Sequence, residues 1–190
     1  MKEKKIIYSR EEMFKMNKKK LEERGVTLED IALIAYKQQS KYNPNIQLST
    51  CLESVAKILT YRDIFHIVQL GIELDILTEQ GKLSEPMQGI LEEDLGMFGI
   101  DELLGLSIAS NYGVIGQTNF GDIDVNKPGI VGKLNKEGKG GKCHTFLDDI
   151  VGALAAAAST RVAQIQSEEV AEHDPNIKQL QMDLKQKKWD

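Results

Sequence analysis

The stretch Cys143–Ser159, CHTFLDDIVGALAAAAS, combines two adjacent carboxylates with a long run of small residues. Asp148 and Asp149 stand near the start of a predicted helix, and Gly152 and the alanines at 155–158 follow them. A helix face made of small residues lets a second helix approach closely. Charged side chains are rarely left beside such an apolar face without a partner. The acidic pair is therefore a candidate metal site next to a close helix contact.

The same pattern occurs a second time in the chain. Residues 101–105 (DELLG) and 148–152 (DDIVG) both read acid, acid, apolar, apolar, glycine. In each, the glycine lies on the helix face of the second acid, because it comes one turn after that acid. Small residues continue this face in both segments, so the two helices are expected to pack with their backbones close. If they run parallel, their acidic ends meet and Glu102 approaches Asp149.

Carboxylates that converge in this way repel one another unless a cation neutralises them. The expected ligands are Asp101, Glu102, Asp148 and Asp149. Because all of them are oxygen ligands, they favour Mg²⁺ first, with Mn²⁺ or Ca²⁺ next. Capping is the alternative explanation, since Asp148 follows Thr145 at capping-box spacing and Asp101 stands at a helix start.

The segment 121–144 between the acidic helices is rich in glycine and lysine, and we expect it to be irregular. Lys127 differs from the other lysines because it stands in FGDIDVNKP, between a helix end and a proline, close to Asp124. A phosphate held between Mg²⁺ and a lysine is a common arrangement in phosphoryl transfer. Lys142 and His144 are further candidates for substrate binding, His144 also as a general acid or base. A solvated loop is the alternative for both.

The periodicity of the apolar residues predicts an all-α fold, a compact bundle of about six to seven helices around a central glycine- and alanine-rich helix pair. Capping signals are found at Ser9, Thr27, Thr50, Thr60 and Ser84. Helices are expected to start at these positions. A single helix is expected over 101–121, and a last one from Thr145 to about 166. Residues 1–166 then form one helical domain, and 167–190 form a polar tail that holds at most a short helix.

Composition excludes several classes of protein. A net charge of −5 over 190 residues argues against a nucleic-acid partner. The two cysteines lie far apart, without the spacing of a zinc knuckle or a disulfide framework. No apolar run reaches the ~18 residues of a spanning helix, so we expect a cytoplasmic protein, at most peripheral to the inner face of the membrane. The small-residue helices and apolar faces make a homo-oligomer plausible.

Three segments together, DELLG, FGDIDVNKP and DDIVGA, resemble the motifs of the phosphatidylglycerophosphatase A family in their order and spacing. The wider chain is similar to the soluble, Firmicute-type branch of that family, to which low temperature requirement C-like proteins belong. YSREEM, ERGVTLEDIA and GKCHTFLDDIVGA carry this second resemblance.

The resemblance implies Mg²⁺-dependent removal of the terminal phosphate from phosphatidylglycerophosphate, giving phosphatidylglycerol. The four acids of the two pairs would bind the metal, and Asp124 and Lys127 would assist with metal or phosphate. Glu102, Asp149 and Lys127 are the expected catalytic residues, with a metal-activated water attacking phosphorus. The chain departs from the membrane-bound members because it lacks their hydrophobic spans and their early glycine- and proline-rich segment.

Two alternatives remain. Another helical Mg²⁺-dependent phosphohydrolase, such as a nucleotide pyrophosphatase, also gathers helix carboxylates, but usually with ExxE and ExxD spacings that are not obvious here. A non-catalytic cold-adaptation or binding protein would use the acids structurally or to bind Ca²⁺. Release of pyrophosphate would indicate the first alternative, and the absence of turnover the second.

Overall fold

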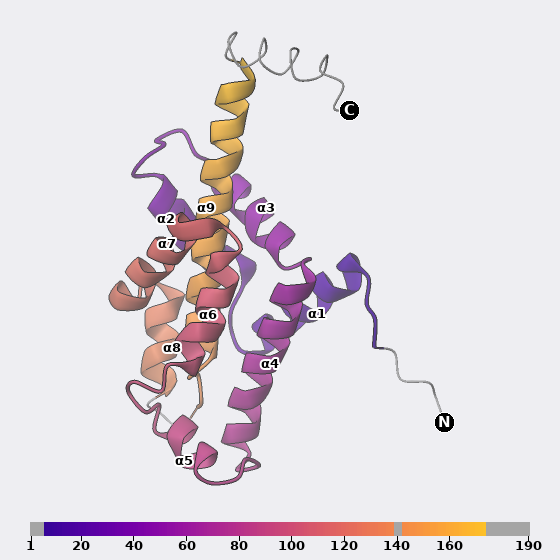
Figure 1. The fold of residues 1–190 in the computed structure, drawn as a ribbon, viewed down its shortest axis with the longest axis vertical. Helices are drawn as coiled ribbons and strands as arrows, with labels where there is room; N and C mark the ends of the chain where they lie inside the picture. The colour runs from indigo at the N-terminus through magenta and orange to yellow at the C-terminus, as the bar shows by residue number, and fades with distance from the viewer. Residues whose placement is uncertain (1–5, 139–141, 174–190) are drawn as a thin grey trace, which may run out of the picture.

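The computed structural model describes residues 6–138 and 142–173, and within them it contains nine α-helices (Figure 1). They are α1 (Arg10–Glu23), α2 (Leu28–Gln39), α3 (Leu48–Ile58), α4 (Arg62–Glu79), α5 (Met87–Glu92), α6 (Ile100–Ser110), α7 (Gly113–Asn126), α8 (Ile130–Gly138) and α9 (Leu147–His173). The all-α prediction is confirmed. The number of helices exceeds the expected six to seven, because one predicted helix is divided and one predicted loop is helical.

Helix α9 is the axis of the fold (Figure 1). It is buried on every face from Leu147 to Thr160, and α2, α3, α4, α6, α7 and α8 all pack against it. The alanines at 155–158 are fully buried. Small side chains on all faces allow this many helices to approach one central helix, since the interaxial distance depends on side-chain size.

Two of the predicted helix starts have the expected geometry. The hydroxyl of Ser9 accepts a hydrogen bond from the Glu12 backbone (3.2 Å), and the Glu12 carboxylate accepts one from the Ser9 backbone (2.9 Å). Thr27 and Asp30 exchange the same pair of bonds at the start of α2. Both capping boxes are confirmed, the second with aspartate in place of the usual glutamate.

Three other predicted caps are wrong. Helix α3 begins before Thr50, which lies inside its first turn. The hydroxyl of Thr60 donates to the carbonyl oxygen of Lys57 (2.7 Å) and so closes α3 instead of opening α4. Helix α5 begins only after Pro86, not at Ser84.

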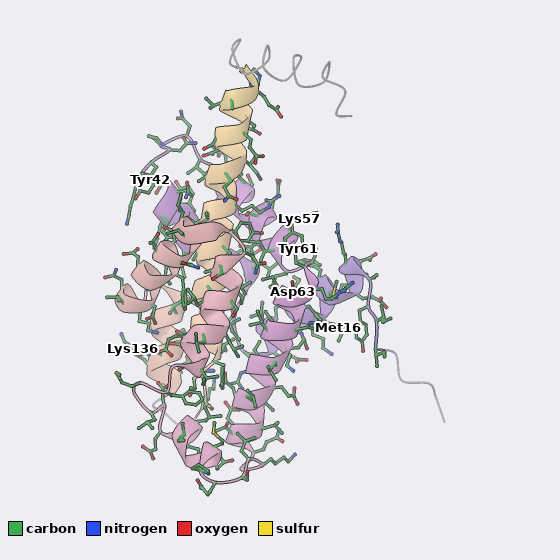
Figure 2. The ribbon with its side chains drawn as sticks, in the orientation of Figure 1. Met16, Tyr42, Lys57, Tyr61, Asp63 and Lys136 are labelled. Carbon is green, nitrogen blue, oxygen red and sulfur yellow. The ribbon has the colours of Figure 1, made fainter. Side chains whose placement is uncertain are left out.

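At the α3–α4 junction the Lys57 ammonium lies 5.9 Å from the ring centroid of Tyr61, an attractive cation–π distance (Figure 2).

The helix predicted over 101–121 is divided into α6 and α7 by a short turn. Helix α6 ends at Ser110, and α7 begins at Gly113, whose φ of 72° is unfavourable for other residues. In α7, Gly116 packs directly on the carbonyl group of Ala109, where a side chain would collide. The glycines that looked like part of one continuous apolar face therefore permit a tight reversal between two helices.

The segment predicted to be irregular is largely helical. Helix α7 continues to Asn126, and α8 occupies 130–138. Lys127 ends α7 in the left-handed conformation (φ 41°), and Pro128 follows and opens α8 by accepting a backbone hydrogen bond from Val131 (3.2 Å). A proline fits a helix start because the first backbone N–H groups have no helical partner.

The predicted domain boundary at 166 falls inside α9, which continues to His173. Residues 174–190, most of the expected tail, lie outside the described part of the chain. Among the described helices, none has both the length and the apolar character needed to cross a bilayer.

Candidate metal centre

The first turns of α6 and α9 meet, and their carboxylates converge. One oxygen each of Asp101, Glu102 and Asp149 lie within 4.8 Å of one another. Asp101 and Asp149 are only 8% and 4% exposed. The expected approach of Glu102 to Asp149 is therefore found in the structure, whereas the metal-binding role of these residues stays a prediction. We call these three residues the carboxylate triad.

The glycine of the first acidic motif makes this approach possible. A Cβ atom on Gly105 would lie 3.2 Å from the carbonyl oxygen of Asp149 and 2.6 Å from Cζ of Phe120. The α6 backbone thus lies against the α9 backbone at the acidic residue itself. The corresponding Gly152 of α9 also faces α7, where its Cβ would lie 3.1 Å from Cγ2 of Ile123. Both glycines therefore contact α7, but only Gly105 also lies against the backbone of the other acidic helix.

Two acids of the carboxylate triad have raised pKa values, and two of its oxygens lack a hydrogen-bond partner. Burial, followed by the neighbouring Asp148, raises the pKa of Asp149 to about 8. Burial, followed by Glu102, raises the pKa of Asp101 to about 7. Oδ1 of Asp101 and Oε2 of Glu102 are buried and make no hydrogen bond to any residue that the structure describes. Buried polar atoms are normally partnered.

A hard divalent cation fits these properties. Octahedral Mg²⁺ binds oxygens at about 2.0–2.1 Å, so opposite ligands are about 4 Å apart, close to the spread of the triad. Carboxylate oxygens are the donors that Mg²⁺ and Mn²⁺ prefer. A cation would also satisfy the two unpartnered oxygens and favour the ionised form of all three acids.

The fourth predicted ligand, Asp148, lies instead beside a lysine. Nζ of Lys127 is 2.7 Å from Oδ1 of Asp124, 3.1 Å from Oδ2 of Asp148 and 3.4 Å from Oδ1 of Asp149. Burial disfavours the charged ammonium, but these carboxylates, Asp148 first, raise the pKa of Lys127 above its usual value. The predicted set of acids is thus divided between the triad and a lysine, and Asp149 belongs to both groups.

His144 and Lys142 are not at the carboxylate triad. His144 is buried, and its Nδ1 lies 3.1 Å from a guanidinium nitrogen of Arg24, which must be the donor. Burial, and then Arg24, lower the pKa of His144, so the ring is neutral near pH 7. Lys142 is exposed and lies 3.5 Å from Glu137. Lys136, another lysine of this segment, lies on the exposed side of α8 (Figure 2).

A cleft in the surface of the molecule leads toward Asp148 from the side of His144. Its main part has a volume of about 460 Å³. Polar residues from the ends of α4, α5 and α8 and from the segment before α9 form most of its lining: Thr78, Glu79, Glu92, Glu93, Asp94, Gly138, Lys142 and Cys143. A smaller hollow shares part of this lining and extends to His144 and Asp148. Lys142 and His144 therefore line this cleft and its smaller hollow, and not the carboxylate triad.

Asp75 of α4 orients the start of α9, and the sequence analysis missed it. Its carboxylate accepts hydrogen bonds from the backbone N–H groups of Phe146 (3.1 Å) and Leu147 (3.0 Å). Thr145, the predicted cap, donates its hydroxyl to the carbonyl oxygen of Leu91 (3.0 Å) instead. Asp75 is fully buried, and this burial raises its pKa to about 7, although the hydrogen bonds that it accepts act in the opposite direction. An acid between apolar neighbours in LDIL (residues 74–77) was the available signal.

The raised pKa values predict a pH dependence of the metal-free protein. Asp101 and Asp149 release protons near pH 7 and 8 when folded, but near pH 4 when unfolded, so the folded state binds more protons between these values. The free energy of unfolding should therefore fall by several kcal/mol as the pH rises from about 5 to 8.5, since each pKa unit corresponds to about 1.4 kcal/mol. Urea titrations in EDTA across this range measure it.

Addition of Mg²⁺ should weaken this dependence, because a bound cation replaces the protons. The variant Asp149→Asn should also show a shallower pH dependence than the unmodified protein. Unfolding free energies that rise steadily with pH in EDTA would contradict the electrostatic description of the triad.

Comparisons with known proteins place the chain in a family. Residues 40–164 match the family model of phosphatidylglycerophosphatase A. The uncharacterized protein YpjQ of Bacillus subtilis is 51% identical over 156 residues, which cover 82% of this chain and 87% of YpjQ.

Solved structures agree with this placement. The crystal structure of B. subtilis ypjQ has a TM-score of 0.80 at 49% identity and covers 85% of this chain and 99% of that one. The low temperature requirement C protein of Listeria monocytogenes has a TM-score of 0.79 at 46% identity, covering 82% of this chain and 97% of that one. The resemblance seen in the motifs is confirmed, and the chain belongs to the phosphatidylglycerophosphatase A family.

Proposed function

We propose that this protein is a Mg²⁺-dependent phosphatase that hydrolyses a phosphomonoester, with phosphatidylglycerophosphate as its substrate. The observation that carries the proposal is the carboxylate triad, two of whose acids are buried and two of whose buried oxygens are unpartnered, next to the ammonium of Lys127. Family membership supports phosphatase chemistry. The metal and the lipid substrate are inferences from the residues and the family.

In this proposal Asp101, Glu102 and Asp149 bind the cation. A cation held by these residues would supply Lewis-acid chemistry, polarising the phosphoryl oxygens and making a water molecule more acidic. Lys127 would exchange its longest contact, the one to Asp149 (3.4 Å), for a hydrogen bond to the transferred phosphate, whose negative charge it would stabilise. Asp124 and Asp148 orient that lysine through the ion pairs already present. No cysteine or serine nucleophile is required.

The surface next to the triad suits a lipid substrate. Several large apolar side chains are exposed around the start of α6, namely Leu95, Met97, Ile100 and Leu103. Met97 is 98% exposed and stands in a turn with a φ of 69°. Asp101 and Glu102 are neighbours of these residues in the chain. Contact of this surface with acyl chains would bring a phosphorylated head group close to the triad.

Phosphate release from a panel of substrates tests the proposal. We expect turnover of phosphatidylglycerophosphate in mixed micelles, a loss of at least about 100-fold in EDTA, and recovery with Mg²⁺ or Mn²⁺. Glycerol 3-phosphate and a nucleoside triphosphate complete the panel. Preference for glycerol 3-phosphate would contradict the lipid substrate but support phosphomonoester hydrolysis. Pyrophosphate release from the nucleoside triphosphate would favour the nucleotide pyrophosphatase alternative. Turnover that EDTA does not affect would contradict the proposed centre.

A further inference from the structure

Lys127 occupies a position that resembles a cation site. Its ammonium has three N–H donors, and three carboxylates, those of Asp124, Asp148 and Asp149, lie 2.7–3.4 Å from Nζ. The side chains of Asp148 and Asp149 are only 8% and 5% exposed. A surface ion pair normally joins one lysine to one acid, so this arrangement is closer to a coordination shell.

The backbone holds Lys127 in this place. Its φ of 41° is unfavourable for a residue with a side chain, and its N–H donates to the carbonyl oxygen of Ile123 (2.8 Å). Pro128 fixes the chain on the other side. Gly132 packs against the carbonyl oxygen of Lys127 so closely that a Cβ atom would collide with it. Both neighbouring helices therefore constrain the point from which the lysine reaches the acids.

Asp149 connects this position to the carboxylate triad. One of its oxygens lies 3.4 Å from the lysine ammonium, and the residue also contributes an oxygen to the triad. Two neighbouring cation positions that share a carboxylate are the arrangement of two-metal sites. Here one position is filled by an ammonium, while the other has the unpartnered oxygens of Asp101 and Glu102.

We propose that Lys127 acts as the second cation of this centre, so that each chain binds one divalent ion and not two. The inference rests on the proposed binding of a cation at the triad. Removal of the lysine leaves Asp124 and Asp148 without their counter-ion, beside an Asp149 that already ligates a metal. These three carboxylates would then admit a second divalent ion.

Counting Mn²⁺ ions on the full chain tests this inference. Native mass spectrometry and calorimetric titration should find one Mn²⁺ per chain in the unmodified protein and two in Lys127→Met. Lys127→Arg, which keeps the charge, should bind one. Lys133→Met is the matched control, because it removes an exposed lysine of the adjacent helix α8 that lies 3.6 Å from Glu137; it should also bind one.

The outcomes distinguish the inference from the function on which it rests. Two ions on the unmodified protein would overturn the second-cation role of Lys127 but leave a metal-dependent phosphatase in place, and this count does not depend on how the variants fold. If the unmodified protein and Lys127→Met each bound one ion, the second-cation role of Lys127 would also be overturned. Absence of Mn²⁺ binding by the unmodified protein would overturn both the inference and the proposed centre.

Discussion

Replacement of Asp149 by asparagine is expected to lower phosphate release by about 10³-fold while the protein remains folded. Asp149 is the acid shared by the carboxylate triad and Lys127, so the change weakens the cation site and the placement of the lysine together. Removal of one preorganised charged group from an active site commonly costs 10²–10³-fold in turnover. Here two interactions with the reacting phosphate depend on the same carboxylate.

The same variant should be more stable than the unmodified protein in the absence of metal. Burial and the adjacent Asp148 disfavour the charged form of Asp149, and an amide removes that charge at nearly constant volume. We expect a gain of about 1–3 kcal/mol in the free energy of unfolding in EDTA near pH 8. A variant that is inactive and more stable separates a functional role from a structural one.

Steady-state phosphate release and urea unfolding, both with and without Mg²⁺, measure these effects. Asp122→Asn is the matched control, because Asp122 is an exposed acid of α7 that hydrogen-bonds Asn126. It should retain full activity and an unchanged stability within about 0.5 kcal/mol. If D149N kept more than a tenth of the original turnover, the triad would not be the catalytic centre.

Replacement of Gly105 by valine is expected to lower the free energy of unfolding by about 2–4 kcal/mol and to weaken Mn²⁺ binding more than tenfold. The added side chain must displace the ring of Phe120 and the backbone of α9 at Asp149. Backbone cannot give way as cheaply as a flexible side chain. Because Asp101 and Glu102 are on α6 and Asp149 is on α9, any separation of these helices also separates the ligands.

Gly121→Ala is the control for this substitution. Gly121 lies within α7, and its Cβ would meet no atom of the described residues within 4 Å. Alanine there should raise the free energy of unfolding by about 0.5–1 kcal/mol, because glycine is the more flexible residue in the unfolded chain. Urea titration and Mn²⁺ calorimetry compare the two variants. If Gly105→Val had the same stability and the same Mn²⁺ affinity as the unmodified protein, the α6–α9 contact would not position the triad.

Local sequence patterns identified the parts of this site that depend on helix geometry. The spacing of acid and glycine in DELLG and DDIVG placed these residues on one helix face, because 3.6 residues complete a turn. The small residues after Asp149 indicated close packing, and the structure buries that whole stretch. The motif FGDIDVNKP singled out Lys127 from the other lysines of its segment, and Lys127 reaches Asp148 and Asp149 in the structure.

Other features depended on residues that are distant in the chain. Asp75 lies 71 positions before Phe146, whose backbone N–H donates to it; its apolar neighbours mark the acid as unusual but do not identify this partner. The separation of Asp148 from the triad also could not be read from the motif. Adjacent residues on a helix point about 100° apart, so Asp149 faces α6 while Asp148 contacts Lys127 at the end of α7.

The chain alone was sufficient to predict an all-α fold and two acidic helix starts, which are consequences of periodicity and side-chain size and act over a few residues. The resemblance of its motifs was sufficient to indicate the family. Only the packed structure decided which carboxylates form a triad and which surround a lysine. That division depends on how α6 and α7 are oriented on α9, and this orientation depends on glycine contacts between segments far apart in sequence.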